Sequence, residues 1–241
     1  MIRRESLHPI TQIERQVVSI FQDMGFEVIE GPLVETEWYN FDALNIPKDH
    51  PARDLQDTFN LKDKEDKILR TQTSAVQVRY MEKHKPPFKI VCPGKVFRRD
   101  ANDPSHIPEF YQIEGLKVSQ DASMAELKGV LDTFAKNFFG PEIKVRWRPG
   151  YFPFVEPGME VDVECSICKG EGCLTCAKSG WVELLGAGMV HPNVFRAAKY
   201  DPDEWQGYAF GIGMDRLAMM KFEINDIRTL YSGDLRFLKQ F

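Results

Sequence analysis

Four of the five cysteines of the chain lie close together, at Cys165, Cys168, Cys173 and Cys176. Each CxxC pair can place two sulfurs on one side of a tight turn, and four thiolates complete the tetrahedral coordination of a structural Zn²⁺. In a reducing compartment such a cluster is more often a metal site than a pair of disulfides. The spacing therefore predicts structural zinc. An iron–sulfur cluster or metal-free thiols are the alternatives.

The residues on either side of the cysteines predict two strands. The stretch MEVDVEC (159–165) alternates apolar and polar residues, as a half-buried strand does, and GWVELLGAGMV (180–190) indicates a second strand. Residues 164–180 are thus expected to form a zinc knuckle at the tip of a β-hairpin. A finger that reads DNA needs a basic recognition helix, and none follows here. We interpret the knuckle as a staple between two strands.

A second polar group surrounds the loop Ala101–Pro108, between the expected strands 88–100 and 109–119. Side chains alternate along a strand, so Arg98 and Asp100 share one face of the first strand, and Gln112 and Glu114 share one face of the second. If both pairs line one cleft, they supply cations for a phosphate and acceptors for an amine. A solvated hairpin is the alternative.

The sequence GIGMDRLAMM predicts a glycine-rich turn from a strand into a helix whose first turn carries Arg216. It lacks the third glycine of a dinucleotide-binding fingerprint. Its backbone can nevertheless approach a phosphate closely, and a guanidinium binds phosphate oxygens in a fork. A plain strand–helix turn with a surface arginine is the alternative.

Two aromatic residues, Phe152 and Phe154, stand two apart in GYFPFVEP. We expect this segment to be extended, with both rings on one side and Pro153 fixing the backbone. Core packing is the ordinary explanation for such a pair. A role in substrate contact gains weight only beside a polar site.

These residues must be positioned by a framework that the apolar periodicity predicts in outline. Helices are expected at 9–24, 36–44, 74–84 and 123–140, and after the turn in 207–222; strands are expected at 26–32, 68–73, 88–100, 109–119, 143–149, 159–165 and 180–190. Strands dominate the middle of the chain and helices flank them. The pattern favours an α+β fold with a largely antiparallel sheet.

Length and charge limit the function classes. The 241 residues suffice for one large domain or two small ones, and the net charge of −5 does not resemble that of a nucleic-acid-coating protein. No apolar run is long enough for a membrane helix, and the first residues do not resemble a secretory signal. We therefore expect a cytoplasmic protein with no membrane association.

Taken together, the motifs resemble the catalytic domain of the phenylalanyl-tRNA synthetase α subunit, a class II aminoacyl-tRNA synthetase, from about His8 to Phe241. The resemblance is carried by FDALNIPKDHPARD, LRTQTSAVQVRYM, GKVFRRD, QIEGL, YFPFVEP, LGAGMVHPNV and GYAFGIGMDRLAM. It implies the class II catalytic fold over residues 1–241, a mostly antiparallel sheet flanked by helices. The family's N-terminal coiled-coil arm, which binds tRNA, is expected to be absent.

The resemblance also implies the roles of the site residues. In ATP binding, Arg98 would contact the α-phosphate, His106 the phosphates and Arg216 the γ-phosphate, with Asp100 at a position that usually holds Glu. The residues that would hold the amino and carboxylate groups of the substrate are Gln72, Ser74, Gln112 and Glu114; many bacterial members have His in place of Gln72. The residues that would form the pocket for the aromatic ring are Phe152, Phe154 and Ala209.

Further residues would serve partners and metals. Pro32 would be the proline of the first class II motif, at the subunit interface. Glu156 would contact a Mg²⁺ shared with the β subunit, and the four cysteines would hold structural Zn²⁺. ATP, L-phenylalanine, tRNA(Phe) and the β subunit are the implied partners. For the isolated chain we expect a homodimer or a monomer–dimer mixture.

The implied reaction is activation of L-phenylalanine with ATP to phenylalanyl-adenylate, followed, with the partner subunit, by transfer to tRNA(Phe). It needs positioning and charge stabilisation and no protein nucleophile. One alternative is a class II relative that activates another amino acid; the apolar pocket argues against it, because a polar substrate would be left unpaired there. The other is a non-catalytic or regulatory paralogue, which the retained arginines and Glu114 argue against.

Overall fold

The structure is a computed structural model that describes residues 7–53, 58–62, 64, 66–165, 168–173 and 176–241. Residues 1–6 of the expected domain, 54–55 of the expected loop after Ile46, and 166–167 and 174–175 of the expected knuckle lie outside the described residues. Among the described residues, strands form a seven-stranded sheet in the order β1-β4-β5-β9-β8-β7-β6, beside a small sheet of β2 and β3. Only the β1–β4 pair of the large sheet is parallel. The expected α+β fold is confirmed.

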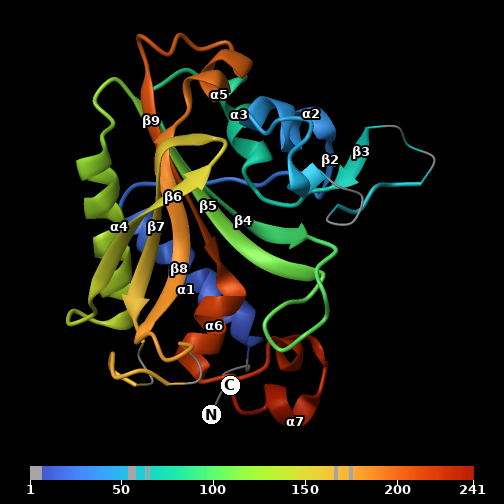
Figure 1. The fold of residues 1–241 in the computed structure, drawn as a ribbon, viewed down its shortest axis with the longest axis vertical. Coiled ribbons are helices and arrows are strands. Elements are labelled where there is room, and N and C mark those ends of the chain that lie inside the picture. Colours follow the sequence, from blue (N-terminus) through green and yellow to red (C-terminus); the bar gives the residue numbers. More distant parts are fainter. Residues whose placement is uncertain (1–6, 54–57, 63, 65, 166–167, 174–175) are drawn as a thin grey trace, which may run out of the picture.

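The sheet runs through the centre of the molecule (Figure 1). Its strands, from one edge to the other, are β1 (Glu27–Val28), β4 (Phe88–Phe97), β5 (Glu109–Ser119), β9 (Gln206–Gly213), β8 (Trp181–Val190), β7 (Val155–Glu164) and β6 (Val145–Phe152). The small sheet consists of β2 (Val34–Thr36) and β3 (Lys67–Leu69). The hairpins β4–β5, β6–β7 and β7–β8 account for the antiparallel character that the sequence predicts.

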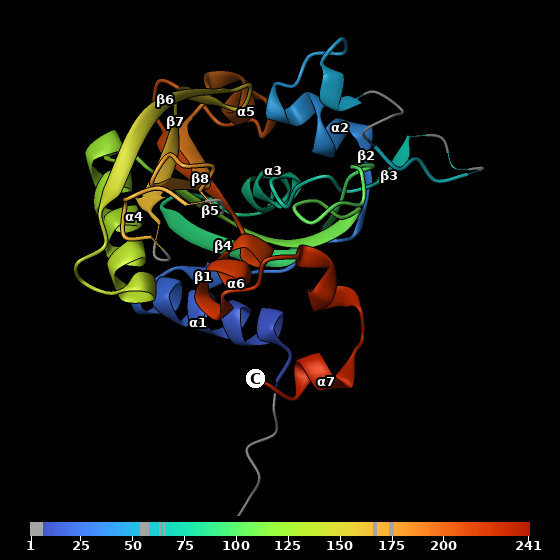
Figure 2. The same ribbon diagram turned by 60° about the horizontal axis from the view of Figure 1, so that its bottom comes forward.

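Helices cover both faces of the sheet. Figure 2 shows α1 (Pro9–Asp23) below it and α3 (Ala75–Met81) above it. The other helices are α2 (Glu37–Asn40), α4 (Met124–Phe139), α5 (Pro192–Ala197), α6 (Met214–Phe222) and α7 (Leu235–Leu238), with 3₁₀ turns at Asp42–Leu44, Pro51–Arg53 and Ile227–Tyr231. None of the described helices has both the length and the apolar character that a membrane crossing requires.

Helix α1 shows how local sequence sets these elements. His8 caps its start by accepting the Ile10 N–H through Nδ1 at 3.2 Å, and Pro9 occupies the first turn, where no N–H is needed. Gly25, with φ of 79°, follows its end. The apolar face carries Phe21, which stacks on Phe134 of α4 and on Phe210 of β9, at 5.1 and 4.9 Å between ring centroids. Helix and sheet therefore share one aromatic core.

Several expected elements differ from the structure. The strand predicted over residues 68–73 ends at Leu69, and the helix predicted over 36–44 ends at Asn40, before the 3₁₀ turn Asp42–Leu44. The strand predicted over residues 26–32 ends at Val28, so Pro32 lies exposed beyond it. The segment around Phe152 is not extended: Pro153 and Phe154 form the turn between β6 and β7, and Phe152 pairs with Val155 across it. A proline is favoured at the second position of such a turn because its φ is already fixed there.

Two glycines give a matched test of this packing. A Cβ on Gly115 in β5 would lie 2.1 Å from the Phe210 ring, whereas a Cβ on Gly129 in α4 would meet nothing within 4 Å. We expect Gly115→Ala to cost about 1–3 kcal/mol through overpacking. Gly129→Ala should stabilise the helix by roughly 0.5–1 kcal/mol. Thermal unfolding of the two variants checks this, and equal melting temperatures would contradict the packing described here.

Candidate active site

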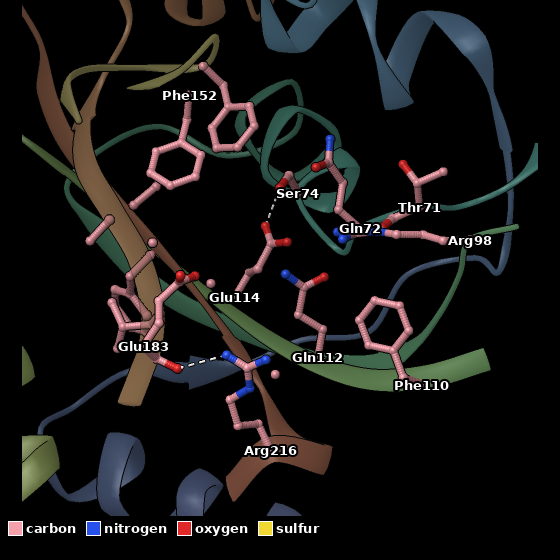
Figure 3. Close-up of a pocket in the computed structure, with 18 of the residues that line it drawn as sticks. Thr71, Gln72, Ser74, Arg98, Phe110, Gln112, Glu114, Phe152, Glu183 and Arg216 are labelled. Carbon is pink, nitrogen blue, oxygen red and sulfur yellow. Dashed lines mark hydrogen bonds between the residues drawn. The ribbon is translucent and has the colours of Figure 1, made fainter. Parts of the chain in front are cut away.

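One cavity, with a volume of about 690 Å³, is lined by β5, β8, β9 and the segments around them. It collects every residue that the sequence predicts for ATP or amino-acid binding. These lining residues are Gln72, Ser74, Arg98, Asp100, His106, Gln112, Glu114, Phe152, Phe154, Ala209 and Arg216. Figure 3 shows side chains from opposite walls of this cavity pointing toward its centre.

The cavity exists because small residues face each other across two strands. Gly186 of β8 pairs with Gly211 of β9, and Gly188 pairs with Ala209. A Cβ on Gly186 would lie 2.6 Å from the Phe152 ring, and one on Gly211 would lie 3.1 Å from the Gln112 side-chain nitrogen. Both glycines therefore leave the space that side chains from neighbouring elements enter.

One end of the cavity is apolar. The rings of Phe152 and Phe154 stack with centroids 6.0 Å apart and planes 26° apart. The turn that carries them is held by Asn45, whose Nδ2 donates to the Pro153 carbonyl at 2.7 Å. Ala209 is 5% exposed on the wall below. A flat apolar group of limited length fits this end.

The centre of the cavity presents hydrogen-bond acceptors. Glu114 of β5 is buried and accepts hydrogen bonds from the Ser74 hydroxyl and, at 3.4 Å, from Gln77 Nε2. Burial raises the pKa of Glu114 to about 7, while the Ser74 hydrogen bond and the Arg98 charge lower it. Two residues earlier, Gln112 carries a buried Oε1 with no hydrogen-bond partner among the described residues. This pair of acceptors matches a cationic amine.

Two arginines enter the cavity from different elements. Arg98 follows β4 directly; its Nε donates to the Thr71 carbonyl at 3.1 Å and its guanidinium lies 5.1 Å from the Phe110 ring centroid. Arg216 stands in the first turn of α6, and its Nη1 donates to the Glu183 carbonyl at 3.1 Å. In Figure 3, Glu114 lies between Phe152 above and Arg216 below. The cavity thus has a cationic side suited to phosphates.

The residue before Arg216 fixes the start of α6. The buried Asp215 carboxylate accepts the Tyr111 N–H at 2.6 Å and the Tyr231 hydroxyl at 2.5 Å. Burial raises the pKa of Asp215 to about 6, and these two hydrogen bonds oppose the rise. Asp215 therefore ties α6 to β5 and to the 3₁₀ turn Ile227–Tyr231, which sets the position of its neighbour Arg216.

Asp100 and His106 lie at the rim of the cavity, on the loop between β4 and β5. The His106 ring is exposed, and its Nδ1 lies 3.1 Å from both carboxylate oxygens of Asp103. Asp103 also accepts the backbone N–H groups of Ser105 and His106, at 2.7 and 2.8 Å. These contacts shape the loop at the cavity entrance.

Glu156 does not join this group. Its side chain is 75% exposed, does not line the cavity and lies 3.4 Å from His191 Nε2. The predicted magnesium contact at Glu156 stays a prediction, since the cysteines form the only candidate metal-binding group found among the described residues.

The four cysteines meet between β7 and β8. Their sulfurs all lie within 4.8 Å of one another, and three of the sulfur pairs are 3.8 Å apart. A tetrahedron with metal–sulfur bonds of about 2.3 Å has edges of about 3.8 Å, so the donor set fits a metal ion. Backbone N–H groups of Gly172 and Cys173 point at Cys168 and Cys176 sulfurs, at 3.2 and 3.1 Å. The cluster could therefore bind a metal.

Several cavity residues were not predicted from the sequence. Gln77 follows Ser74 by three residues on one helix, and Phe110 precedes Gln112 by two on one strand, so helix and strand periodicity could have indicated both. Asp215 was visible only as the neighbour of Arg216. Glu183 is one acidic residue in a strand, and we find no sequence signal that distinguishes it.

Comparisons with known proteins agree with this geometry. The family described as tRNA synthetases class II core domain (F) matches residues 1–241. A phenylalanine–tRNA ligase alpha subunit from Caldicellulosiruptor saccharolyticus is 55% identical over 236 residues, which cover 98% of this chain and 69% of that protein. Alpha subunits from Shouchella clausii and Bacillus licheniformis are 55% and 54% identical, with 98% and 100% of this chain and 69% and 70% of theirs covered. The chain therefore belongs to the class II aminoacyl-tRNA synthetase core family, among the phenylalanine–tRNA ligase alpha subunits.

Proposed function

We propose that the cavity activates L-phenylalanine with ATP, giving phenylalanyl-adenylate and pyrophosphate, and that the chain then charges tRNA(Phe) together with a β subunit. The observation that supports this best is the order of groups in one cavity. Stacked phenylalanine rings lie at one end of the cavity, a carboxylate and an amide oxygen lie at its centre, and two arginines lie on the side away from the rings. An aromatic amino acid and a nucleotide phosphate have complementary groups in that order.

The amino acid is recognised through its ammonium group and its ring. The ammonium would donate to the Glu114 carboxylate and to Gln112 Oε1, the acceptor without a partner among the described residues. Ser74 and Gln72 complete the polar contacts; Gln72 is held by its own bond to the Asn40 carbonyl at 3.2 Å. The ring would lie against Phe152 and Phe154, with Ala209 limiting its length.

The chemical step joins a carboxylate oxygen of phenylalanine to the α-phosphorus of ATP. The bond from that phosphorus to the bridging oxygen breaks, and pyrophosphate leaves with the electron pair. Arg98 would stabilise charge at the α-phosphate and Arg216 at the γ-phosphate, while His106 and Asp100 at the rim contact ATP. Preorganised cations of this kind lower the barrier because they need no reorganisation during the reaction. The ribose hydroxyl of tRNA then attacks the carbonyl carbon, and AMP leaves.

Two metals belong to the proposal. Cys165, Cys168, Cys173 and Cys176 would hold Zn²⁺ as a structural ion, because their sulfur spacing suits tetrahedral thiolate coordination. Mg²⁺ would neutralise the phosphate charge of ATP. Glu156, which lies outside the cavity lining, would offer its exposed carboxylate to a Mg²⁺ shared with the β subunit.

The β subunit would cover an apolar surface beside Pro32. Leu33, Val34 and Trp38 are exposed there, at 44%, 39% and 40%. Exposed apolar side chains so close together in the chain support an interface at this position. The same surface would drive homodimer formation when the chain is isolated. With its tRNA substrate, the enzyme would act in the cytoplasm.

Pyrophosphate exchange with each of the twenty amino acids tests the activity. We expect exchange with phenylalanine; tyrosine should be poorer by roughly tenfold to a hundredfold, because an unpaired buried hydroxyl costs about 1–3 kcal/mol. Arg98→Ala and Arg216→Ala should each reduce exchange by about a hundredfold or more. Preference for another amino acid would point to a different synthetase, and no exchange at all would point to a non-catalytic paralogue.

The raised pKa of Glu114 predicts how phenylalanine binding depends on pH. The ionised carboxylate binds the ammonium, so affinity is full only well above the pKa of about 7 and is lost as the pH falls through it. KM for phenylalanine should rise roughly fivefold between pH 7 and pH 6. Glu114→Gln should bind more weakly but lose this dependence. A parent KM that stays flat from pH 8 to pH 6 would contradict the assignment.

Metal analysis tests the knuckle. Protein produced with zinc available should contain about one zinc per chain. Replacing Cys165 and Cys168 together by serine should lower the melting temperature more than it changes KM for ATP or phenylalanine, because the cluster lies outside the residues that line the cavity. Protein with neither zinc nor iron would show that the four cysteines do not hold a structural metal ion between the two strands.

A further inference from the structure

Arg70 is a buried cation that the reaction scheme above does not use. It follows β3 directly and is 2% exposed. Its Nε donates to the Lys95 carbonyl at 2.7 Å and its Nη1 to the Gly31 carbonyl at 3.2 Å. Among the described residues it forms no ion pair with a carboxylate. Buried arginines are rare without such a partner, because taking the charge out of water is costly.

The residues around Arg70 leave space for its side chain and hold its backbone in place. A Cβ on Gly94 of β4 would lie 2.1 Å from Arg70 Nη2, so only glycine leaves room for the guanidinium there. The backbone of Arg70 is held as well: its N–H donates to the Leu33 carbonyl at 2.9 Å, and its carbonyl accepts the Phe97 N–H at 2.9 Å. One residue therefore joins the segment 31–33 to the last residues of β4.

The segment that begins at Arg70 contacts both the arginine proposed to bind phosphate and the carboxylate proposed to bind the amine. The next residue, Thr71, accepts the bond from Arg98 Nε, and three residues on, Ser74 binds Glu114. The Arg70 carbonyl binds Phe97, the immediate neighbour of Arg98. A shift of Arg70 relative to β4 would thus move the phosphate-binding arginine relative to the acceptor for the amine.

The charge of Arg70 also reaches Glu114. Burial raises the pKa of Glu114, and the Ser74 hydroxyl, Arg98, the Thr73 N–H and Arg70 lower it, in that order. Gln77 also faces the carboxylate. The Cys92 thiol lies nearby, but burial raises its pKa to about 12, so it stays neutral and does not cancel the charge of Arg70.

We propose that Arg70 is a positioning residue for amino-acid activation: its buried guanidinium clamps the end of β4 to the segment 70–74 and so fixes Arg98 relative to Glu114. The proposal rests on the proposed function, because it concerns the geometry of that reaction. Arg70 contacts neither substrate in this scheme. It acts through the Lys95 and Gly31 carbonyls and through the residues next to it.

The test compares Arg70→Met and Arg70→Lys with the parent, each assembled with its β subunit, in pyrophosphate exchange. Arg70→Met should lower kcat by about tenfold to a hundredfold, the scale for a misplaced group at a reacting centre. KM for ATP should change less than kcat, since the lost interaction matters most in the transition state. Arg70→Lys keeps the charge and can make one of the two carbonyl bonds, so it should recover part of the loss.

The pH dependence of KM for phenylalanine is a second readout, and it would not change if Arg70 had a purely structural role. Removing the positive charge raises the pKa of Glu114 further, so the rise in KM for phenylalanine should begin at higher pH in Arg70→Met. Arg70→Lys should keep the parent pH profile.

Arg79→Met is the matched control. Arg79 forms a two-point ion pair with the fully buried Glu35, at 2.8 and 2.6 Å, and does not line the cavity. Loss of this ion pair in Arg79→Met should lower the melting temperature at least as much as Arg70→Met does. In the same variant, kcat per folded enzyme should stay within about twofold of the parent.

The outcomes separate the hypotheses. A lower melting temperature with unchanged kcat and pH profile in Arg70→Met would overturn the proposal, as would an equal loss of kcat in Arg79→Met. If Arg70→Met does not fold, Arg70→Lys decides: a parent-like melting temperature with reduced kcat supports positioning, and parent-like values of both overturn it. A parent that exchanges no pyrophosphate with phenylalanine would instead refute the proposed function.

Discussion

A ligand can approach the backbone of a sheet closely only where the side chains on that face are small, and this constraint governs the geometry of the cavity. Opposed small residues on β8 and β9, Gly186 with Gly211 and Gly188 with Ala209, hollow the face of an otherwise well-filled sheet. The hollow lets the Phe152 ring lie against one strand and the Gln112 amide against the other. Without it, neither the apolar end nor the polar centre of the cavity would have space.

The hollow also controls the electrostatics. Because it is partly closed off from water, each charged group in it needs compensation from the protein. Glu114 obtains it from a hydroxyl, an amide and two arginines, and Asp215 from an N–H and a phenol. The elements that carry these donors come from distant parts of the chain. Fold stability and site geometry are therefore set by the same hydrogen bonds, and loss of one affects both.

The sequence predicts the main helices and the long hairpins because their apolar periodicity is strong, as α1, β4 and β5 illustrate. The cavity residues were predicted chiefly by their resemblance to a known family. The geometry of the turn could not be predicted from the sequence. Nothing in GYFPFVEP distinguishes an extended segment from a hairpin until the pairing of Phe152 with Val155 is known. The sequence places Arg70 in an expected strand and does not predict its burial. That burial depends on Gly94, a glycine 24 residues away, and the apolar periodicity does not connect the two positions.

The cysteine cluster has a consequence for the floor of the cavity. It brings Cys165, which directly follows β7, next to Cys176, which precedes β8 by five residues, and the Cys165 N–H donates to the Gly180 carbonyl at 2.9 Å. Side chains alternate along a strand, so a slip of β8 by one residue would turn Gly186 away and bring Leu185 or Ala187 to its place. The β7–β8 pair already contains a register shift between Val161 and Asp162. A metal ion held by the four cysteines would fix this register, and it would thereby help to select which residues of β8 face the cavity.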